Sequence, residues 1–197
     1  MTKPSLIAGL ICVLLVRGLT AAGRAHAQSP GQWVVPAGCE VAVFAENVEN
    51  PREMALGPQG TVFVGSRTAG KVHAVIDRDG DHEADRVVVI ASGLDQPNGV
   101  AIRNGALYVA TASKILRFDD IERRLDSPPV LVVVRDSLPT PNAGHTWKSI
   151  AFGPDDLLYM SVGAPCNVCL SPPTVSTIVR MKPDGSALSR RWFVVRQ

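Results

Sequence analysis

Three stretches of this sequence repeat one pattern, and this pattern restricts the fold more than any other feature of the chain. The copies cover residues 54–64, 100–109 and 150–160. Each consists of an apolar segment, a tight turn with Gly or Asp, and a second apolar segment, which is the pattern of a β-hairpin. Ala55, Ala101 and Ala151 mark a spacing of about 46 to 50 residues, and this period is typical of β-propeller blades.

The repeat therefore predicts an all-β chain folded as part of a β-propeller. Strands are expected at residues 40–44, 62–65, 71–76, 87–91, 100–102, 107–110, 115–118, 130–134, 150–152, 157–162 and 177–182, and at most a helical turn at 119–125. A propeller closes with roughly four to eight blades of four strands each, and this chain supplies only about three. We therefore expect it to be the N-terminal portion of a larger propeller, truncated at its C-terminus.

The N-terminus has the features of a secretory signal. Lys3 precedes an apolar run over residues 6–16, and Ala25-His26-Ala27 forms a cleavage site of the A-x-A type. The run is shorter than the roughly 20 residues of a membrane-spanning helix. We therefore expect residues 1–27 to be a signal peptide and the mature chain to be periplasmic or secreted, without a membrane span. Residues 28–39 should be an irregular lead-in, and 40–197 a partial propeller domain.

Charge excludes one class of partner. The net charge is +2, and the basic residues are scattered along the chain. A nucleic-acid-binding protein usually gathers them into a stripe or patch, so we expect no nucleic-acid partner.

The loop before the third hairpin is the best candidate for catalysis. Inner strands line the central channel of a propeller, so a loop that leads into one lies at a mouth of that channel. His145 lies in this loop, and a histidine can act as a general base at neutral pH. The alternative is a histidine that only hydrogen-bonds the backbone of a connecting loop.

The segment from His145 to Cys169 resembles the soluble sugar dehydrogenases that depend on pyrroloquinoline quinone (PQQ), the L-sorbosone dehydrogenase branch in particular. The likeness extends to N-P-R at 50–52, G-L-D-Q-P-N-G-V-A at 93–101, R-F-D-D-I at 117–121 and M-K-P-D-G at 181–185. It implies a six-bladed propeller that holds PQQ and Ca²⁺, a sugar substrate and a periplasmic electron acceptor. It also implies that His145 takes the substrate's hydroxyl proton while hydride passes to PQQ.

The same resemblance implies two cofactor contacts, from Gln96 and Arg196; the alternative for Gln96 is an ordinary turn residue. Residues 189–195 depart from the family pattern, which suggests a shifted reading frame, and the family's remaining PQQ and Ca²⁺ ligands would lie beyond residue 197. Because PQQ is a tricarboxylate that needs several basic groups and a metal, we expect little or no activity from this chain alone.

An acidic loop offers a possible Ca²⁺ site. Asp77, Asp79, Asp81 and Asp85 surround a glycine, and Ca²⁺ takes six to eight oxygen ligands. The spacing departs from that of an EF-hand, and the alternative is a solvated turn between outer strands.

The pair Cys166 and Cys169 has three possible roles. A c-type haem site is excluded because Leu170 replaces the required histidine, and a zinc site lacks a second ligand pair. A local disulfide is the simplest role in an exported protein, which leaves Cys39 unpaired or as a competing partner.

Two alternative functions remain for a propeller of this kind. One is a non-catalytic binding scaffold of the NHL type, in which His145 is only a loop residue. The other is a Ca²⁺-dependent lactonase, for which Asn98 and Asn142 are the candidate channel residues.

Overall fold

The computed structural model describes residues 34–193, with side chains described up to residue 190. The predicted signal peptide and Arg196 therefore lie outside the described residues. The chain divides into two compact units, residues 1–42 and residues 43–197. Within the first unit, residues 34–42 are irregular apart from a turn at 37–38.

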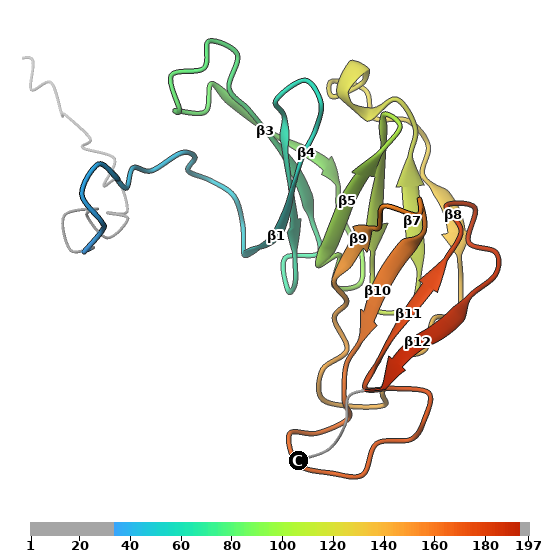
Figure 1. Ribbon diagram of the computed structural model, residues 1–197. Coiled ribbons are helices and arrows are strands. Elements are labelled where there is room, and N and C mark those ends of the chain that lie inside the picture. Colours follow the sequence, from blue (N-terminus) through green and yellow to red (C-terminus); the bar gives the residue numbers. More distant parts are fainter. Residues whose placement is uncertain (1–33, 194–197) are drawn as a thin grey trace, which may run out of the picture. The chain divides into compact units, whose positions relative to one another are not determined.

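The second unit contains three four-stranded antiparallel sheets, each with its strands in sequence order (Figure 1). The first sheet contains β1 (Pro51–Leu56), β2 (Val62–Ser66), β3 (Val72–Ile76) and β4 (Arg86–Ala91). The second contains β5 (Gly99–Arg103), β6 (Ala106–Ala110), β7 (Ile115–Phe118) and β8 (Val132–Arg135). The third contains β9 (Ile150–Phe152), β10 (Leu158–Val162), β11 (Thr177–Met181) and β12 (Ser189–Phe193). These sheets are the predicted propeller blades.

The repeated hairpins are the first two strands of each blade. Ala55 pairs with Phe63, Ala101 with Tyr108 and Ala151 with Tyr159. The tight turns need residues that tolerate a positive φ. Gly60 has φ +89°, Asn104 and Gly105 have +51° and +76°, and Asp156 has +61°. The local sequence thus fixes both the strands and the turns that join them.

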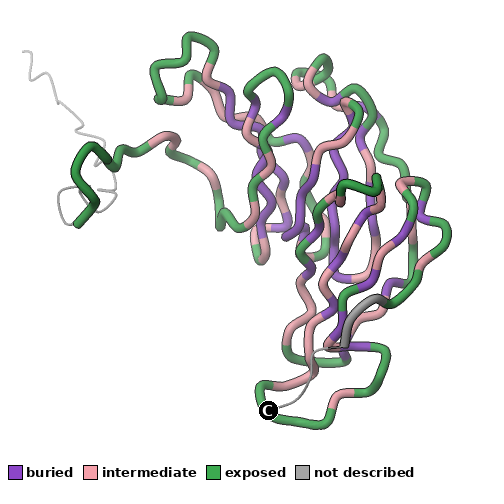
Figure 2. Tube along the Cα trace, in the orientation of Figure 1, coloured by how far each residue is buried: buried purple, intermediate pink, exposed green. Residues whose placement is uncertain are grey.

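The blades pack on one another through their inner strands, because β5 contacts both β1 and β9 (Figure 1). One apolar cluster lies between the first and second blades and includes Phe63, Leu107 and Phe118. A second lies between the second and third blades and includes Ile150 and Met160. Figure 2 shows that burial follows the strands while the connecting loops are exposed. Each large apolar side chain buried in this way contributes about 1.5–3 kcal/mol to folding.

Two sequence expectations need correction or completion. Residues 40–44 form no strand: four of the five are apolar, but Val41 and Val43 are about 40% exposed and no ladder forms there. A strand needs a partner edge, and residues 40–44 pair with neither end strand of the first blade. The single turn η2 (Ile121–Arg123) agrees with the predicted helical turn. Among the described residues, no helix is long and apolar enough to cross a membrane.

Candidate functional site

The antiparallel register brings several loops to one end of the three blades. Pro51 pairs with Ser66, and Gly99 with Ala110, so each inner strand begins where the second strand of its blade ends. The third blade repeats this arrangement. We call this end the mouth, and it comprises residues 50–53, 66–71, 95–98, 111–114, 144–149 and 163–176.

Two glycines allow the His145 loop to lie directly against the loop that follows β10. A Cβ on Gly163 would stand 2.1 Å from the His145 carbonyl oxygen, and one on Gly144 would stand 2.5 Å from that of Pro165. Gly144 also has φ +77°. With both side chains absent, the His145 N–H donates to the Ala164 carbonyl at 3.0 Å. The backbone of His145 is therefore tied to the third blade.

The His145 side chain is half-buried and has two close neighbours. Its Nε2 lies 2.9 Å from Oδ1 of Asn167, which belongs to the β10–β11 loop. Its ring meets the Trp147 indole edge-on, with centroids 5.1 Å apart. The Arg67 guanidinium carbon lies 3.8 Å from the centroid of the Trp147 ring, a distance typical of cation–π contacts. The mouth therefore joins a potential base to an aromatic face and a cation.

Asn50 holds the loop that carries Arg67. Its Oδ1 accepts hydrogen bonds from the backbone N–H groups of Arg67 and Thr68, at 3.1 and 2.8 Å, and from the Thr68 hydroxyl at 3.0 Å. Asn50 itself has φ +48°, which asparagine tolerates better than most residues. The N-P-R motif at 50–52 thus has a structural role at the mouth.

Gln96 lies beside the His145 loop. The Thr146 hydroxyl donates to Oε1 of Gln96 at 2.8 Å. Gln96 adopts φ +48°, and its carbonyl accepts the Asn98 N–H at 2.7 Å. The structure therefore brings Gln96 next to His145 without a direct contact between the two side chains.

Glu53 connects the inner strands of all three blades. Its Oε1 accepts hydrogen bonds from the Asn98 amide at 2.9 Å and from the Ser149 hydroxyl. Asn98 is buried and also donates to the Lys148 carbonyl at 3.0 Å. Burial raises the pKa of the Glu53 carboxyl, and the hydrogen bonds from Ser149 and Asn98 partly offset this effect. Asn142, by contrast, is exposed.

Lys148 is fully buried, which is rare for a lysine without a charged partner. Its ammonium donates to the Thr146 carbonyl at 3.4 Å, and it has no ion pair within the described part of the chain. Burial lowers the pKa of Lys148 to about 8.

A small cavity opens at the mouth. Its volume is about 210 Å³, and it is lined by Pro51, Arg52, Glu53, Asn98 and Trp147. A small molecule in this cavity would contact Glu53, Asn98 and Trp147.

The acidic loop lies at the opposite end of the first blade, because it joins the end of β3 to the start of β4. The carboxylates of Asp77, Asp79 and Asp85 lie within 4.8 Å of one another. Asp81 does not join this group; its Oδ1 accepts the Glu83 N–H at 2.8 Å. The Asp77 carboxylate accepts the N–H groups of Gly80 and His82. Ca²⁺ binding here stays a prediction.

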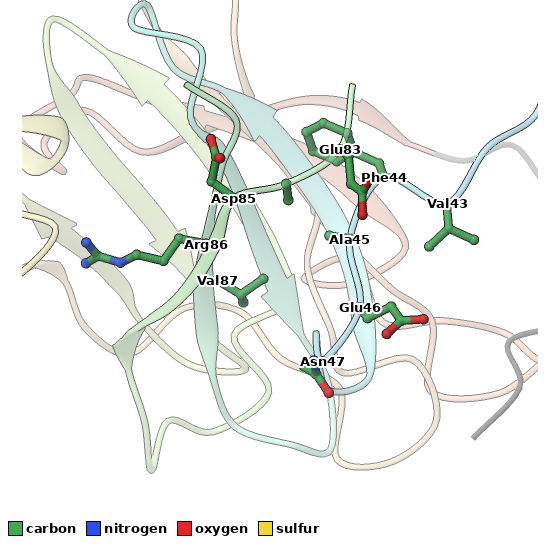
Figure 3. A pocket seen from close by; sticks show the side chains of 10 residues that line it. Val43, Phe44, Ala45, Glu46, Asn47, Glu83, Asp85, Arg86 and Val87 are labelled. Atoms are coloured by element: carbon green, nitrogen blue, oxygen red, sulfur yellow. The ribbon is translucent and has the colours of Figure 1, made fainter. Parts of the chain in front are cut away.

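A larger cavity, of about 460 Å³, adjoins this acidic loop (Figure 3). It is lined by residues 43–47 and 83–87. The carboxylates of Glu46, Glu83 and Asp85 are among its side chains, together with Phe44. Of the predicted site residues, only Asp85 lines this cavity. The cavity adjoins the β3–β4 loop, which lies at the opposite end of the first blade from the mouth.

Cys166 and Cys169 form the predicted local disulfide. Cys39 is an exposed free thiol. The disulfide closes a short ring that contains Asn167, the neighbour of His145.

Glu53, Arg67 and Lys148 are the mouth residues that sequence reasoning missed. The repeat itself held a signal, because Glu53 occupies the position just before the repeated segment, where the other copies have Gly99 and Ser149. A charged residue in one copy and small residues in the others indicate a side chain that reaches across to its neighbours.

Solved structures with a similar fold include two PQQ-dependent dehydrogenases and a carbohydrate-active enzyme. The PQQ-bound aldose sugar dehydrogenase of Streptomyces coelicolor is 24% identical, with a TM-score of 0.56 over 74% of this chain and 48% of that one. The pyranose dehydrogenase PQQ domain of Coprinopsis cinerea is 13% identical, with a TM-score of 0.61 over 72% of this chain and 35% of that one. The family AA12 carbohydrate-active enzyme of Trichoderma reesei is 17% identical, with a TM-score of 0.64 over 78% of this chain and 40% of that one.

These similarities confirm the β-propeller fold of the PQQ sugar dehydrogenases, and the chain spans less than half the length of each of these structures. None of the curated proteins is similar in sequence to this chain. The family profile described as "Domain of unknown function (DUF7133)" matches residues 26–191, which include the first two blades and the third as far as the middle of β12. The chain therefore belongs to the DUF7133 family.

Proposed function

We propose that this chain is part of a PQQ-dependent dehydrogenase that oxidises a sugar aldehyde or an aldose, of the L-sorbosone dehydrogenase type. The observation that carries the proposal is the placement of His145. It is half-buried at the mouth, its backbone is fixed by Ala164, and its ring lies between Asn167 and Trp147. A general base needs a fixed position within reach of its proton, and these contacts provide one.

The donor groups at the mouth fit the charge of such a cofactor. PQQ carries three carboxylates, and Arg52 and Arg67 bring two guanidinium groups to this end of the blades. Gln96 uses its oxygen for Thr146, which leaves its amide nitrogen as a donor to an anion. When bound, the quinone supplies the electron acceptor for the oxidation. We propose these three residues as cofactor contacts, together with Arg196.

The chain's own task in the reaction is proton transfer. His145 accepts the proton of a substrate hydroxyl, and for an aldehyde this hydroxyl belongs to the hydrate. Ca²⁺ at the acidic loop would lie at the other end of the first blade, so its role there would be structural. We propose that the protein acts after export, with a periplasmic electron acceptor.

The test starts with cofactor binding, because the chain spans less than half of each dehydrogenase structure. We expect little or no activity from this chain alone, so the protein tested is the complete dehydrogenase of which the chain is proposed to be a part. It is titrated with PQQ in the presence of Ca²⁺, and binding is followed by tryptophan fluorescence. Dye reduction with L-sorbosone or glucose then measures turnover. His145→Ala should retain PQQ binding and lose about 10²–10⁴-fold in turnover, while His82→Ala, an exposed residue, should match the wild type. Absence of PQQ binding, or equal turnover in His145→Ala, would contradict the proposal.

The lactonase alternative is supported by one observation, the convergence of Glu53 and Asn98 at the mouth. It predicts Ca²⁺-dependent hydrolysis of a sugar lactone, lost in Glu53→Gln and unchanged in His145→Ala. The two variants thus separate the two enzymes. A protein that shows neither activity and binds no PQQ would be the non-catalytic scaffold.

A further inference from the structure

Asn167 is held opposite His145 by covalent and backbone contacts rather than by a flexible loop alone. The Cys166–Cys169 disulfide closes a four-residue ring around it. Gly163 and Gly144 allow the two loops to touch, and the Ala164 carbonyl accepts the His145 N–H. The distance of 2.9 Å between His145 Nε2 and Asn167 Oδ1 therefore joins two anchored segments.

The chemistry of this contact fixes where the imidazole proton sits. An amide oxygen only accepts hydrogen bonds, so the nitrogen that meets it must carry the hydrogen. His145 is then protonated at Nε2, and Nδ1 keeps a lone pair. Within the described residues, Nδ1 of His145 has no hydrogen-bond partner. The contact with Asn167 thus leaves Nδ1 as the nitrogen able to accept a proton.

We propose that Asn167, presented by the Cys166–Cys169 ring, is a positioning residue that sets the tautomer and ring orientation of His145. The proposal rests on the proposed role of His145 as a proton acceptor. Asn167 itself touches no reacting atom in this role. It acts by holding the imidazole so that Nδ1 keeps the lone pair that can accept the substrate's proton.

The experiment measures the tautomer directly and needs no cofactor. The full chain is labelled with ¹⁵N-histidine, and long-range ¹H–¹⁵N spectra identify which ring nitrogen carries the hydrogen. The chain has four histidines, so a His145→Gln sample assigns the His145 signals. The variants are Asn167→Ala, Asn167→Asp and the double replacement of Cys166 and Cys169 by serine. Val168→Ala is the matched control, because Val168 lies in the same ring and is 95% exposed.

The wild type should show a single tautomer with hydrogen on Nε2. Asn167→Asp retains an acceptor oxygen and loses the amide donor, so it should keep this tautomer, as should Val168→Ala. Asn167→Ala and the double serine variant should show a mixture of tautomers. Hydrogen on Nδ1 in the wild type, a change in Asn167→Asp, or an unchanged spectrum in Asn167→Ala would each overturn the proposal. An unchanged spectrum in the double serine variant would overturn the role of the disulfide.

Turnover of the complete dehydrogenase, of which this chain is proposed to be a part, provides the second readout. Asn167→Ala should lower kcat by less than His145→Ala does, with KM nearly unchanged, and Asn167→Asp should restore kcat. If His145→Ala leaves turnover unaffected, the proposed function fails, whereas the spectra still decide whether Asn167 sets the tautomer. The two failures are therefore distinguishable.

Discussion

Replacement of Lys148 by methionine should stabilise the fold, because it removes a charge that folding buries. Lys148 is fully buried, and its ammonium has one hydrogen bond, to the Thr146 carbonyl at 3.4 Å. Burial lowers the pKa from 10.5 to about 8. Each pKa unit corresponds to about 1.4 kcal/mol, so retention of the proton in the folded state costs about 3 kcal/mol. Methionine has a similar length and shape and no charge to bury.

The pH dependence of this effect has a defined sign. Below pH 8 the lysine is protonated in both states, and the full cost is present. Between pH 8 and 10.5 the unfolded chain binds a proton that the folded chain has lost, so the stability of the wild type should rise with pH. Lys148→Met lacks this titration. Its advantage of up to about 3 kcal/mol at pH 7 should therefore shrink as the pH approaches 10.5.

Urea unfolding followed by circular dichroism, at several pH values from 7 to 10.5, measures the difference between the two proteins. The control is Lys114→Met, because Lys114 is 43% exposed and pairs with Asp136 at 3.3 Å. Its effect should stay within about 0.5 kcal/mol at all pH values. An equal stability of Lys148→Met and wild type at pH 7, with parallel pH profiles, would refute the reasoning.

Three further changes test other parts of the structure. Gly163→Ala places a Cβ 2.1 Å from the His145 carbonyl oxygen, so it should destabilise the fold by about 1–3 kcal/mol. An unchanged Tm would contradict the close packing of the two loops. Glu53→Ala leaves the buried Asn98 amide without one of its acceptors. Urea unfolding should therefore show a loss of about 1–3 kcal/mol in the free energy of unfolding. A smaller loss would mean that the three blades do not depend on this carboxylate. Millimolar Ca²⁺ should raise Tm through the acidic loop, and EDTA should reverse the rise. Asp79→Asn should show neither change. An equal response in that variant would exclude the acidic loop as the Ca²⁺ site.

The sequence alone predicted the blades, because a hairpin is determined by residues that are close together in the chain. Short segments rich in Val and Ile determine the strands, and Gly60, Gly105 and Asp156 provide the positive φ values of the turns. The same local reasoning predicted the Cys166–Cys169 disulfide. It failed at residues 40–44, which have a strand pattern and form no strand, since pairing depends on a free edge elsewhere in the fold.

The tertiary structure decided the composition of the mouth. Glu53 meets Ser149 across 96 residues of sequence and Asn98 across 45, and Arg67 stacks on Trp147 from another blade. No local pattern encodes these contacts, because they depend on the packing of complete blades against one another. The burial of Lys148 has the same origin, since a lysine is ordinarily exposed and only the loops packed around it exclude water. The chain's local sequence thus forms each blade, and the packing of the blades brings His145 together with its neighbours.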